Sequence, residues 1–537
     1  MYASDSFTSL QKHAPRIDTP DFHLKQLIKS PDRLKTFSLG LPGFFFDFSR
    51  QRLDQAVTQN LAALAHETGA KDMFSRMAAG KTVNTTENRA ALHTAARGFL
   101  PFGLPPEDLE IMHEIQTVAQ NIRSFSRDIR DGKITGTRGQ VFTDAVVVGI
   151  GGSYLGCEFV YKALKAGHIP KIRLHFLSNV DIDNFKEVLT HINPDTCLWI
   201  IVSKSYTTTE TMANLAQARA FLEQHSLLPK DHLVTITAKG SPGDDPSNPV
   251  LACFHMFDFI GGRYSVTSAV GGVPLSLAFG FDLFERFLQG CSTMDSHALH
   301  APAAENIPLM AALISIWNIQ ILGYTAQAII PYSSALSKLA PHVQQLYMES
   351  LGKGVDNRGN PLPRPAGSII FGEPGTNAQH SFFQLAHQGP PFPIEFIGVL
   401  RPGCQTAGQV TSKGVYNHQE LWANLIAQTL ALAEGMDHEV PARAFSGNRP
   451  SSLLVIDDLS PESIGMLLSF YEARTVFEGF ILGINPFDQF GVELGKVLAS
   501  GIRKEMADKN QHPGHDLTHM DPAAAFYVRS LFAGKTG

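Results

Sequence analysis

One stretch of this sequence, IIVSKSYTTTET at 200–211, begins as an apolar run and then becomes rich in hydroxyl groups around a single lysine. The hydroxyl side chains around Lys204 are those of Ser203, Ser205, Tyr206, Thr207, Thr208, Thr209 and Thr211. Hydroxyls and backbone amides at the start of a helix can surround a phosphate, and a lysine supplies the compensating charge. A serine- and threonine-rich helix cap has the same composition, so this stretch alone leaves both interpretations open.

A second stretch, VVVGIGGSYLG at 146–156, places glycines directly after an apolar run. Gly149, Gly151 and Gly152 would let backbone N–H groups approach an anion at the start of the next helix. The spacing is not the dinucleotide fingerprint, which needs glycine where Tyr154 stands, nor a Walker A loop, which needs lysine where Cys157 stands. Two donor loops after neighbouring strands therefore favour a bound phosphate group over a nucleotide.

Arg263 and Glu349 are candidates for charge stabilisation and proton transfer. Arg263 follows a Gly-Gly turn in 259–272, where a guanidinium could stabilise a developing oxyanion. Glu349 is the only carboxylate in QQLYMESLGKG, 344–354, and its immediate neighbours are neutral. Each could equally be structural, with the arginine paired to a surface carboxylate, so neither segment decides the chemistry by itself.

Two later segments hold further groups that can move protons. The first, 371–389, contains Glu373, His380 and His387, and the second, 485–499, contains Asp488, Gln489, Glu493 and Lys496. A lone histidine is usually a polar core or surface residue, and a glutamate three residues before a lysine is a common helix pair. Neither segment by itself therefore indicates a catalytic residue, and each must be considered together with the other segments.

Short apolar runs recur along the chain at a spacing typical of α/β proteins. They lie at 144–153, 174–179, 197–205, 232–240, 367–375, 391–400 and 451–460. Helix-like stretches separate them, which predicts mostly parallel sheets with helices on both faces. We therefore expect two α/β/α sandwiches in tandem.

The uncharged stretch 309–332 interrupts this rhythm and is long enough to span a bilayer. Asn318, Gln320 and Gln327 break its apolar character, so we interpret it as a buried core helix. The predicted segments are a mainly helical region at 1–120, a first α/β domain at 121–290, a buried connecting helix at 291–335, a second α/β domain at 336–500 and a C-terminal arm at 501–537.

Charge and cysteine content narrow the class of protein. The 537 residues carry a formal net charge of -6, which argues against a nucleic-acid or anionic-membrane partner. The five cysteines are scattered without a C-x-x-C pair, and the N-terminus has no apolar signal segment, so a cytoplasmic protein is expected.

In the tail, HPGHDLTH brings His512, His515, His519 and Asp516 close in sequence, which leaves open a divalent metal site or a flexible surface segment.

Seven segments together resemble the glucose-6-phosphate isomerase family, in that family's order, over about residues 40 to 500. They are GIGGSYLG, SKSYTTTET, GGRYSVTSAVG, MESLGK, GEPGTNAQHSFFQLAHQG, GNRPSSLL and FDQFGVELGK. Tyr154 stands where many members have aspartate, and Leu346-Tyr347 stands where many have Gly-Asp. These departures concern the subfamily more than the activity.

The resemblance implies two sugar-isomerase (SIS-type) domains and a homodimer with its active site at the subunit interface, without metal or organic cofactor. It implies reversible aldose–ketose isomerisation of glucose 6-phosphate to fructose 6-phosphate through an enediol(ate), in glycolysis and gluconeogenesis. A non-catalytic SIS-domain sensor of sugar phosphates, and an isomerase that also accepts mannose 6-phosphate, remain as alternatives.

The resemblance also implies roles for individual residues. Glu349 matches the base, Arg263 the arginine beside the enediolate, His380 the ring-opening histidine supplied by the neighbouring subunit, and Lys496 the lysine that works with it. Residues matching substrate or phosphate contacts are Gly152, Ser153, Ser203, Lys204, Ser205, Thr208, Gln345 and Gln489.

Overall fold

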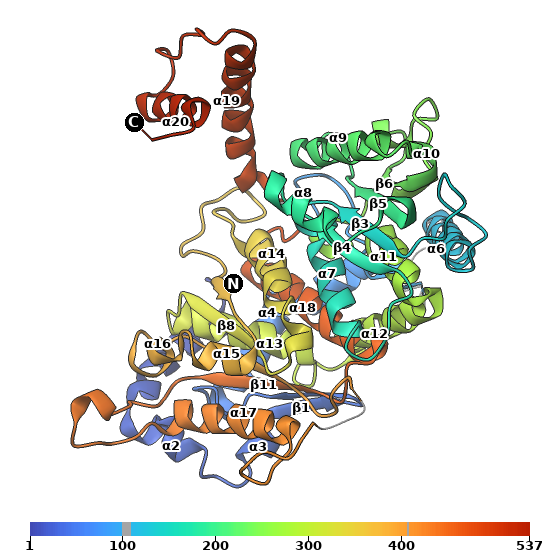
Figure 1. The fold of residues 1–537 in the computed structure, drawn as a ribbon. Coiled ribbons are helices and arrows are strands. Elements are labelled where there is room, and N and C mark those ends of the chain that lie inside the picture. The colour runs from blue at the N-terminus through green and yellow to red at the C-terminus, as the bar shows by residue number, and fades with distance from the viewer. Residues whose placement is uncertain (99–108, 405–407, 537) are drawn as a thin grey trace. The chain divides into compact units, whose positions relative to one another are not determined.

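The computed structural model describes residues 1–98, 109–404 and 408–536, and the chain divides into two compact units, Met1–Phe487 and Asp488–Gly537. The first unit contains two sheets with helices packed on both faces of each (Figure 1). The second consists of helices. Two α/β sandwiches with mostly parallel sheets confirm the expected fold class.

The first sheet contains five parallel strands in the order β4-β3-β5-β6-β7. The strands are β3 (Asp144–Val148), β4 (Arg173–Leu177), β5 (Cys197–Val202), β6 (Leu233–Ala238) and β7 (Ala252–Met256). In β3, Ala145 and Val147 join one buried cluster, and Val146 and Val148 join another on the opposite face. Continuous apolar strands of this kind are typical of parallel sheets that are buried on both sides.

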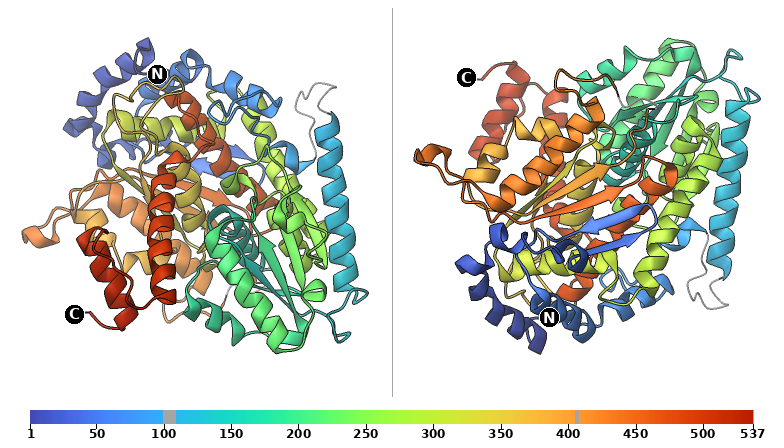
Figure 2. Two further views of the ribbon diagram at one scale, coloured as in Figure 1. Left: turned by 90° about the horizontal axis from the view of Figure 1, so that it is seen from above. Right: turned by 90° about the horizontal axis from the view of Figure 1, so that it is seen from below.

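Helices cover both faces of this first sheet. α8 (Ile182–Leu189) and α9 (Thr209–Gln224) pack on one face. The helices of the other face are α6 (Leu109–Arg130), α7 (Leu155–Leu164), α11 (Ala269–Phe279) and α12 (Phe281–His300). Helix α6, in cyan in Figure 2, runs along the outer side of α11 and α12.

The second sheet contains six strands in the order β1-β2-β11-β10-β8-β9. They are β1 (Ser38–Leu41), β2 (Phe44–Asp47), β8 (Ala326–Pro331), β9 (Ile369–Phe371), β10 (Ile394–Val399) and β11 (Ser451–Ile456). β8 to β11 are mutually parallel, and the hairpin β1–β2 adds antiparallel to β11. Its outer face is covered by α15 (Gly375–Gln379), α16 (Phe383–Gln388) and α17 (Asn417–Glu434).

One local expectation was wrong. The stretch 309–332 is not one helix: α13 (Ile307–Ile316) continues as a π-helical turn and gives way to the central strand β8. Gly323, with φ +75°, makes the turn that ends the helical segment. The N-terminal region also contains more than helix, because the apolar FFFD of β2 is a strand that pairs with β11.

The N-terminal region is otherwise helical in the part that the structure describes. Its helices are α1 (Asp5–His13), α2 (Leu24–Leu27), α3 (Arg33–Thr36), α4 (Gln55–Glu67) and α5 (Ala70–Ala78). Phe74 of α5 stacks on Phe477, with ring centroids 4.5 Å apart. This region therefore contributes to the core of the first unit.

Helix α18 (Pro461–Leu482) lies between the two sandwiches, packed against α12 and α13 and against α14 (Leu339–Leu351). All of its residues except Glu462 are buried. The Ser460 side chain caps its N-terminus and Gly483 ends it in the left-handed conformation, as helix-stop chemistry predicts. One hydrophobic cluster therefore connects the inner faces of both sheets.

The second unit contains α19 (Glu493–Gln511) and α20 (Pro522–Ala533), which are joined by a loop. Leu517, Ala525 and Val528 form its small core. Within the described ranges, no helix combines the length and apolarity needed to cross a bilayer.

Candidate active site

Arg263 and Glu349 lie together in the first unit, although 86 positions separate them in the sequence. Glu349 is in the last part of α14, and Arg263 is in the 3-10 turn Gly262–Tyr264. The Arg263 Nη1 and Glu349 Oε1 atoms are 3.6 Å apart. The Arg263 side chain is 2% exposed and that of Glu349 is 22% exposed, so the cation is fixed in the protein and the carboxylate opens towards solvent.

Hydrogen bonds to Ser350 and to the Pro486 carbonyl hold the Arg263 guanidinium in place. Its Nε donates to Ser350 Oγ at 2.7 Å, and its Nη2 donates to the Pro486 carbonyl at 2.7 Å. The Tyr264 hydroxyl lies 3.0 Å from the same Ser350 hydroxyl. A guanidinium held at two of its edges is a preorganised charge, which is what stabilisation of a developing oxyanion requires.

The first donor loop abuts the turn that carries Arg263. A Cβ atom added to Gly152 would lie 2.2 Å from the Gly262 carbonyl carbon, so only glycine permits this approach. The Ser265 hydroxyl also donates to the Gly152 carbonyl at 3.3 Å. The predicted residues Gly152 and Ser153 therefore belong to the same region as the Arg263 turn.

Helix α14 meets this loop through Gln345. Gly151 has a φ of +58°, and a Cβ added there would lie 3.0 Å from Gln345 Nε2. Gln345 and Glu349 are four residues apart on α14 and so share one face of the helix. In the described chain the buried Gln345 Oε1 has no hydrogen-bond partner, which leaves an acceptor for a ligand hydroxyl.

The second donor loop follows β5, next to β3, whose end carries the first loop. Such adjacent carboxyl ends are where ligands of parallel sheets bind. The buried Ser203 hydroxyl accepts from the Tyr206 amide at 3.1 Å and donates to Thr208 Oγ1 at 3.4 Å. Ser205 is exposed, with its hydroxyl 2.7 Å from that of Thr207. Thr208 is the N-cap residue of α9, so this loop combines hydroxyls with a helix start.

Lys204 is directed towards the segment that leads to Arg263. Its Nζ donates to the carbonyls of Phe257 at 3.3 Å and Asp258 at 3.1 Å, and lies 3.3 Å from the Asp258 carboxylate. Partial burial and the nearby Arg89 charge lower the pKa of Lys204. The lysine thus ties the second loop to the Arg263 segment.

The structure describes the remaining predicted residues, His380, Gln489 and Lys496, each within its own unit. His380 caps the C-terminus of α15 with an exposed side chain, and among the described residues no hydrogen bond or ion pair joins it to Glu349. Gln489 and Lys496 belong to the second unit, where Lys496 is exposed on α19.

The histidines of the tail make a different contact from the one their spacing indicated. His515 Nε2 and His519 Nε2 both bind Glu505 Oε2, at 2.7 and 3.1 Å, while His512 is the C-cap residue of α19. Asp516 accepts from the amide of Thr518. This loop is therefore attached to α19 through Glu505.

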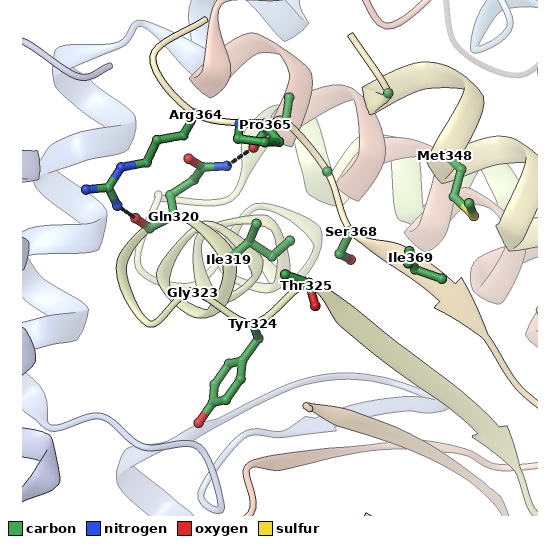
Figure 3. Close-up of a pocket in the computed structure, with 13 residues that line it drawn as sticks. Ile319, Gln320, Gly323, Tyr324, Thr325, Met348, Arg364, Pro365, Ser368 and Ile369 are labelled. Atoms are coloured by element: carbon green, nitrogen blue, oxygen red, sulfur yellow. Dashed lines mark hydrogen bonds between the residues drawn. The ribbon is translucent and has the colours of Figure 1, made fainter. Parts of the chain in front are cut away.

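A cavity of about 530 Å³ has a set of described lining residues that includes none of the residues named above (Figure 3). Its lining is mostly apolar and includes Ile319, Tyr324 and Met348. Gln320 donates to the Pro365 carbonyl at 2.9 Å across one side of it. The described residues that line it include none of those predicted to bind substrate, and an apolar wall does not suit a phosphate.

Ser350 and Tyr264 are site residues that sequence reasoning did not identify. Both are buried and both position Arg263 through hydrogen bonds. Their only signal in the sequence was adjacency to Glu349 and Arg263, which alone does not distinguish a positioning residue from a core residue.

Comparison with known proteins gives a consistent result. Residues 47–520 match the family model described as phosphoglucose isomerase. The chain is 57% identical to the glucose-6-phosphate isomerase of Desulfosudis oleivorans, covering 98% of this chain and 97% of that protein. It is 41% identical to the cytosolic glucose-6-phosphate isomerase of Spinacia oleracea, covering 94% and 91%. The crystal structure of a glucose-6-phosphate isomerase from Chlamydia trachomatis superimposes with a TM-score of 0.90 at 38% identity, covering 99% of both chains.

Proposed function

Because the chain belongs to the phosphoglucose isomerase family, we propose that the region around Arg263 and Glu349 is the active site for that family's reaction. The enzyme interconverts glucose 6-phosphate and fructose 6-phosphate, an aldose–ketose isomerisation of glycolysis and gluconeogenesis. Its substrate is a sugar phosphate.

The pairing of Glu349 with Arg263 is the observation that supports this site most directly. Isomerisation removes a proton next to a carbonyl group and returns it to the neighbouring carbon, so one carboxylate can serve both steps. The oxygen that becomes negative in between needs a fixed cation. At 3.6 Å the ion pair is long, and the partly open Glu349 is free to take the proton while Arg263 stabilises the enediolate.

The phosphate is proposed to bind at the two donor loops, through Gly152, Ser153, Ser203, Ser205 and Thr208. These loops follow adjacent strands, and the first contacts both the Arg263 turn and α14. Phosphate binding at a distance from the reacting carbons contributes binding energy that fixes their position over Glu349. Lys204 adds positive charge at the second loop, and Gln345 offers its acceptor to a sugar hydroxyl.

Ring opening requires a donor to the ring oxygen, and we assign it to His380 together with Lys496. His380 is exposed on its own chain, which suits a residue donated to a second copy of the enzyme.

A histidine donated by a second copy requires a homodimer. Large apolar side chains exposed on α19, namely Leu494, Val497 and Leu498, support an assembly that covers them. All steps use side chains alone, so the proposal includes no cofactor, and Gln489 is assigned to substrate binding.

A cytoplasmic location is proposed with the activity. The spinach relative is described as cytosolic, and Cys157, Cys197, Cys253 and Cys291 are free thiols, which suits a reducing compartment.

Replacement of the proposed base gives the main test. Glu349→Gln keeps the shape of the side chain and removes the proton acceptor, so turnover should fall about 10³-fold. Binding of fructose 6-phosphate, measured by calorimetry, should persist. Glu434→Gln, at an exposed glutamate of α17, is the matched control and should keep full activity. Near-wild-type turnover by Glu349→Gln would rule out the base assignment. If the wild-type protein itself bound fructose 6-phosphate but did not convert it, the sugar-phosphate sensor would be favoured.

The role of His380 is tested by the form of the substrate. His380→Ala should slow turnover of cyclic glucose 6-phosphate about 100-fold, because ring opening loses its acid–base group. An open-chain sugar-phosphate analogue should lose much less. Equal losses on both substrates would remove the ring-opening role.

A further inference from the structure

Asp244, Cys253 and His255 form a cluster of metal-ligating side chains that the proposed reaction does not use. Cys253 and His255 alternate along β7 and therefore lie on one face of this strand, and Asp244 ends the 3-10 turn Pro242–Asp244 that follows β6. Asp244 Oδ1 accepts from His255 Nε2 at 3.0 Å and from Cys253 Sγ at 3.4 Å. The three ligand atoms all lie within 4.8 Å of one another, and the three residues are partly buried.

We propose that these three residues bind a soft divalent cation such as Zn²⁺. A thiolate, an imidazole and a carboxylate are the donor set that zinc prefers. With Zn–S near 2.3 Å and Zn–N and Zn–O near 2.1 Å, tetrahedral ligand atoms are about 3.3 to 3.6 Å apart. The 3.4 Å between Cys253 Sγ and Asp244 Oδ1 already falls in this range, and the 3.0 Å between His255 Nε2 and Asp244 Oδ1 is slightly shorter. Binding would replace the thiol proton, which leaves to solvent, and the Nε2 proton of His255, which moves to Nδ1 as the imidazole changes tautomer, so that the Nε2 lone pair is available to the metal.

An adjoining cavity of about 700 Å³ gives the cluster access to solvent. His255 lines it together with Glu110, His113, Glu114 and Lys239. Three protein ligands with one open position describe an exchangeable zinc site, in which water or a further side chain completes the coordination.

The cluster lies behind the second donor loop. Gly243 precedes Asp244, and a Cβ atom added to Gly243 would lie 2.4 Å from the Tyr206 ring. Tyr206 belongs to the second donor loop and has a φ of +54°, so the turn that carries Asp244 packs tightly against this loop. On the other side, β7 leads directly into Phe257 and the following residue, whose carbonyls hold Lys204 Nζ. An ion bound by Asp244 and by the β7 residues would therefore link the two segments that contact the second donor loop, and this link would restrict the motion of the loop.

This connection predicts a regulatory effect that rests on the proposed function. A braced loop loses less conformational freedom when it binds phosphate, so metal occupancy should lower KM for the sugar phosphate about fivefold. The value of kcat should not change, because Arg263 and Glu349 are held by other contacts.

Cobalt provides a test of the site that does not depend on activity. The full-length protein, freed of metal by chelator, should bind one equivalent of Co²⁺ and show a thiolate-to-cobalt charge-transfer absorption. Cys253→Ser should lose this band, and His255→Asn and Asp244→Asn should weaken binding at least about tenfold. Cys404→Ser, at an exposed cysteine, is the control and should retain it. Absence of the band, or its survival in Cys253→Ser, would overturn the site.

Two further measurements separate the parts of the proposal. In the wild-type protein Zn²⁺ should protect Cys253 from alkylation, read by peptide mass spectrometry, which requires no variant to fold; unprotected Cys253 would contradict the site. Zn²⁺ should lower KM in the wild type and leave Cys253→Ser unaffected. A cobalt band with unchanged KM would overturn the coupling alone, and a metal-binding protein without isomerase activity would contradict the proposed function instead.

Discussion

Two arginine–carboxylate clusters of the first unit differ in how completely their charges are enclosed. Arg97 is ion-paired with Asp295 at 3.2 Å and is in direct contact with Glu472, and all three side chains are at most 2% exposed. Thr267 Oγ1 and Ser469 Oγ accept further hydrogen bonds from the guanidinium, at 2.6 and 3.2 Å. This cluster lies beside α12 and α18 and contributes to the core.

The pair of Arg263 and Glu349 is looser. Its arginine is equally buried, but its carboxylate is 3.6 Å away and partly open. Burial raises the pKa of Glu472 to about 7 and that of Asp295 to about 6, while the Arg97 charge opposes both shifts. The comparison teaches that burial of an arginine does not distinguish structure from chemistry. The freedom left to its carboxylate does.

The largest expected effect comes from breaking the enclosed cluster. Arg97→Met leaves two acidic groups buried without their counter-charge, so the free energy of unfolding should fall by about 3–5 kcal/mol. Denaturant titration measures this change. Arg286→Met removes an exposed ion pair with Glu462 and is the control, with an expected loss below about 1 kcal/mol. If both variants lost the same stability, the enclosed cluster would have no special structural role.

Breaking the looser pair should affect the reaction instead. Lysine at position 263 cannot bind Ser350 and the Pro486 carbonyl at the same time, so Arg263→Lys should lower kcat about 100-fold, or about 3 kcal/mol of transition-state stabilisation. The melting temperature should change little. Arg401→Lys, at an exposed arginine paired with Asp458, should leave kcat unchanged. A large loss of stability with unchanged kcat would reverse the roles of the two clusters.

A buried histidine on α14 makes the free energy of unfolding depend on pH. His342 stacks on Phe159 with ring centroids 5.9 Å apart, and burial lowers the pKa of His342 from 6.5 to about 4. The unfolded chain gains this proton as the pH falls below 6.5, whereas the folded chain stays neutral until about pH 4. Stability present above pH 6.5 is therefore lost as the pH falls, by up to about 1.4 kcal/mol per pH unit.

Replacing this imidazole should remove that dependence. Between about pH 6.5 and 5, His342→Phe should lose about 2 kcal/mol less unfolding free energy than the wild type. Denaturant titrations at a series of pH values give the comparison, with His66→Phe at an exposed site of α4 as the control. Parallel pH profiles for wild type and His342→Phe would show that His342 is not the titrating group.

Much of the first sheet could be predicted because its central strands are short, apolar and buried on both faces. β7 was missed, since its sequence ACFHM is only partly buried and mixes polar with apolar residues. β8 was mistaken for helix because it continues an apolar helical segment without a charged residue between them. The hairpin β1–β2 was missed because its partner, β11, lies more than 400 positions later.

Several predicted site residues that lie together in the structure follow a strand or a glycine turn. Such positions can be recognised in the sequence, because an apolar run or a pair of glycines precedes the polar residues. The contact of Arg263 with Glu349 depends on α14 packing against a distant turn, and no spacing rule reports it. The pairing of Asp244 with Cys253 and His255 across β6 and β7 is likewise a property of the sheet. The roles assigned to His380, Lys496 and Gln489 remain predictions.

The position of α18 has a consequence for synthesis. This helix supplies packing surface to both sandwiches, yet it leaves the ribosome only after the first 460 residues have been made. Helices α12, α13 and α14 emerge earlier and lack this packing partner until then, which favours temporary collapse or chaperone binding. A nascent chain released before residue 482 should therefore aggregate, while a few more codons should let the two sandwiches fold as one cooperative body.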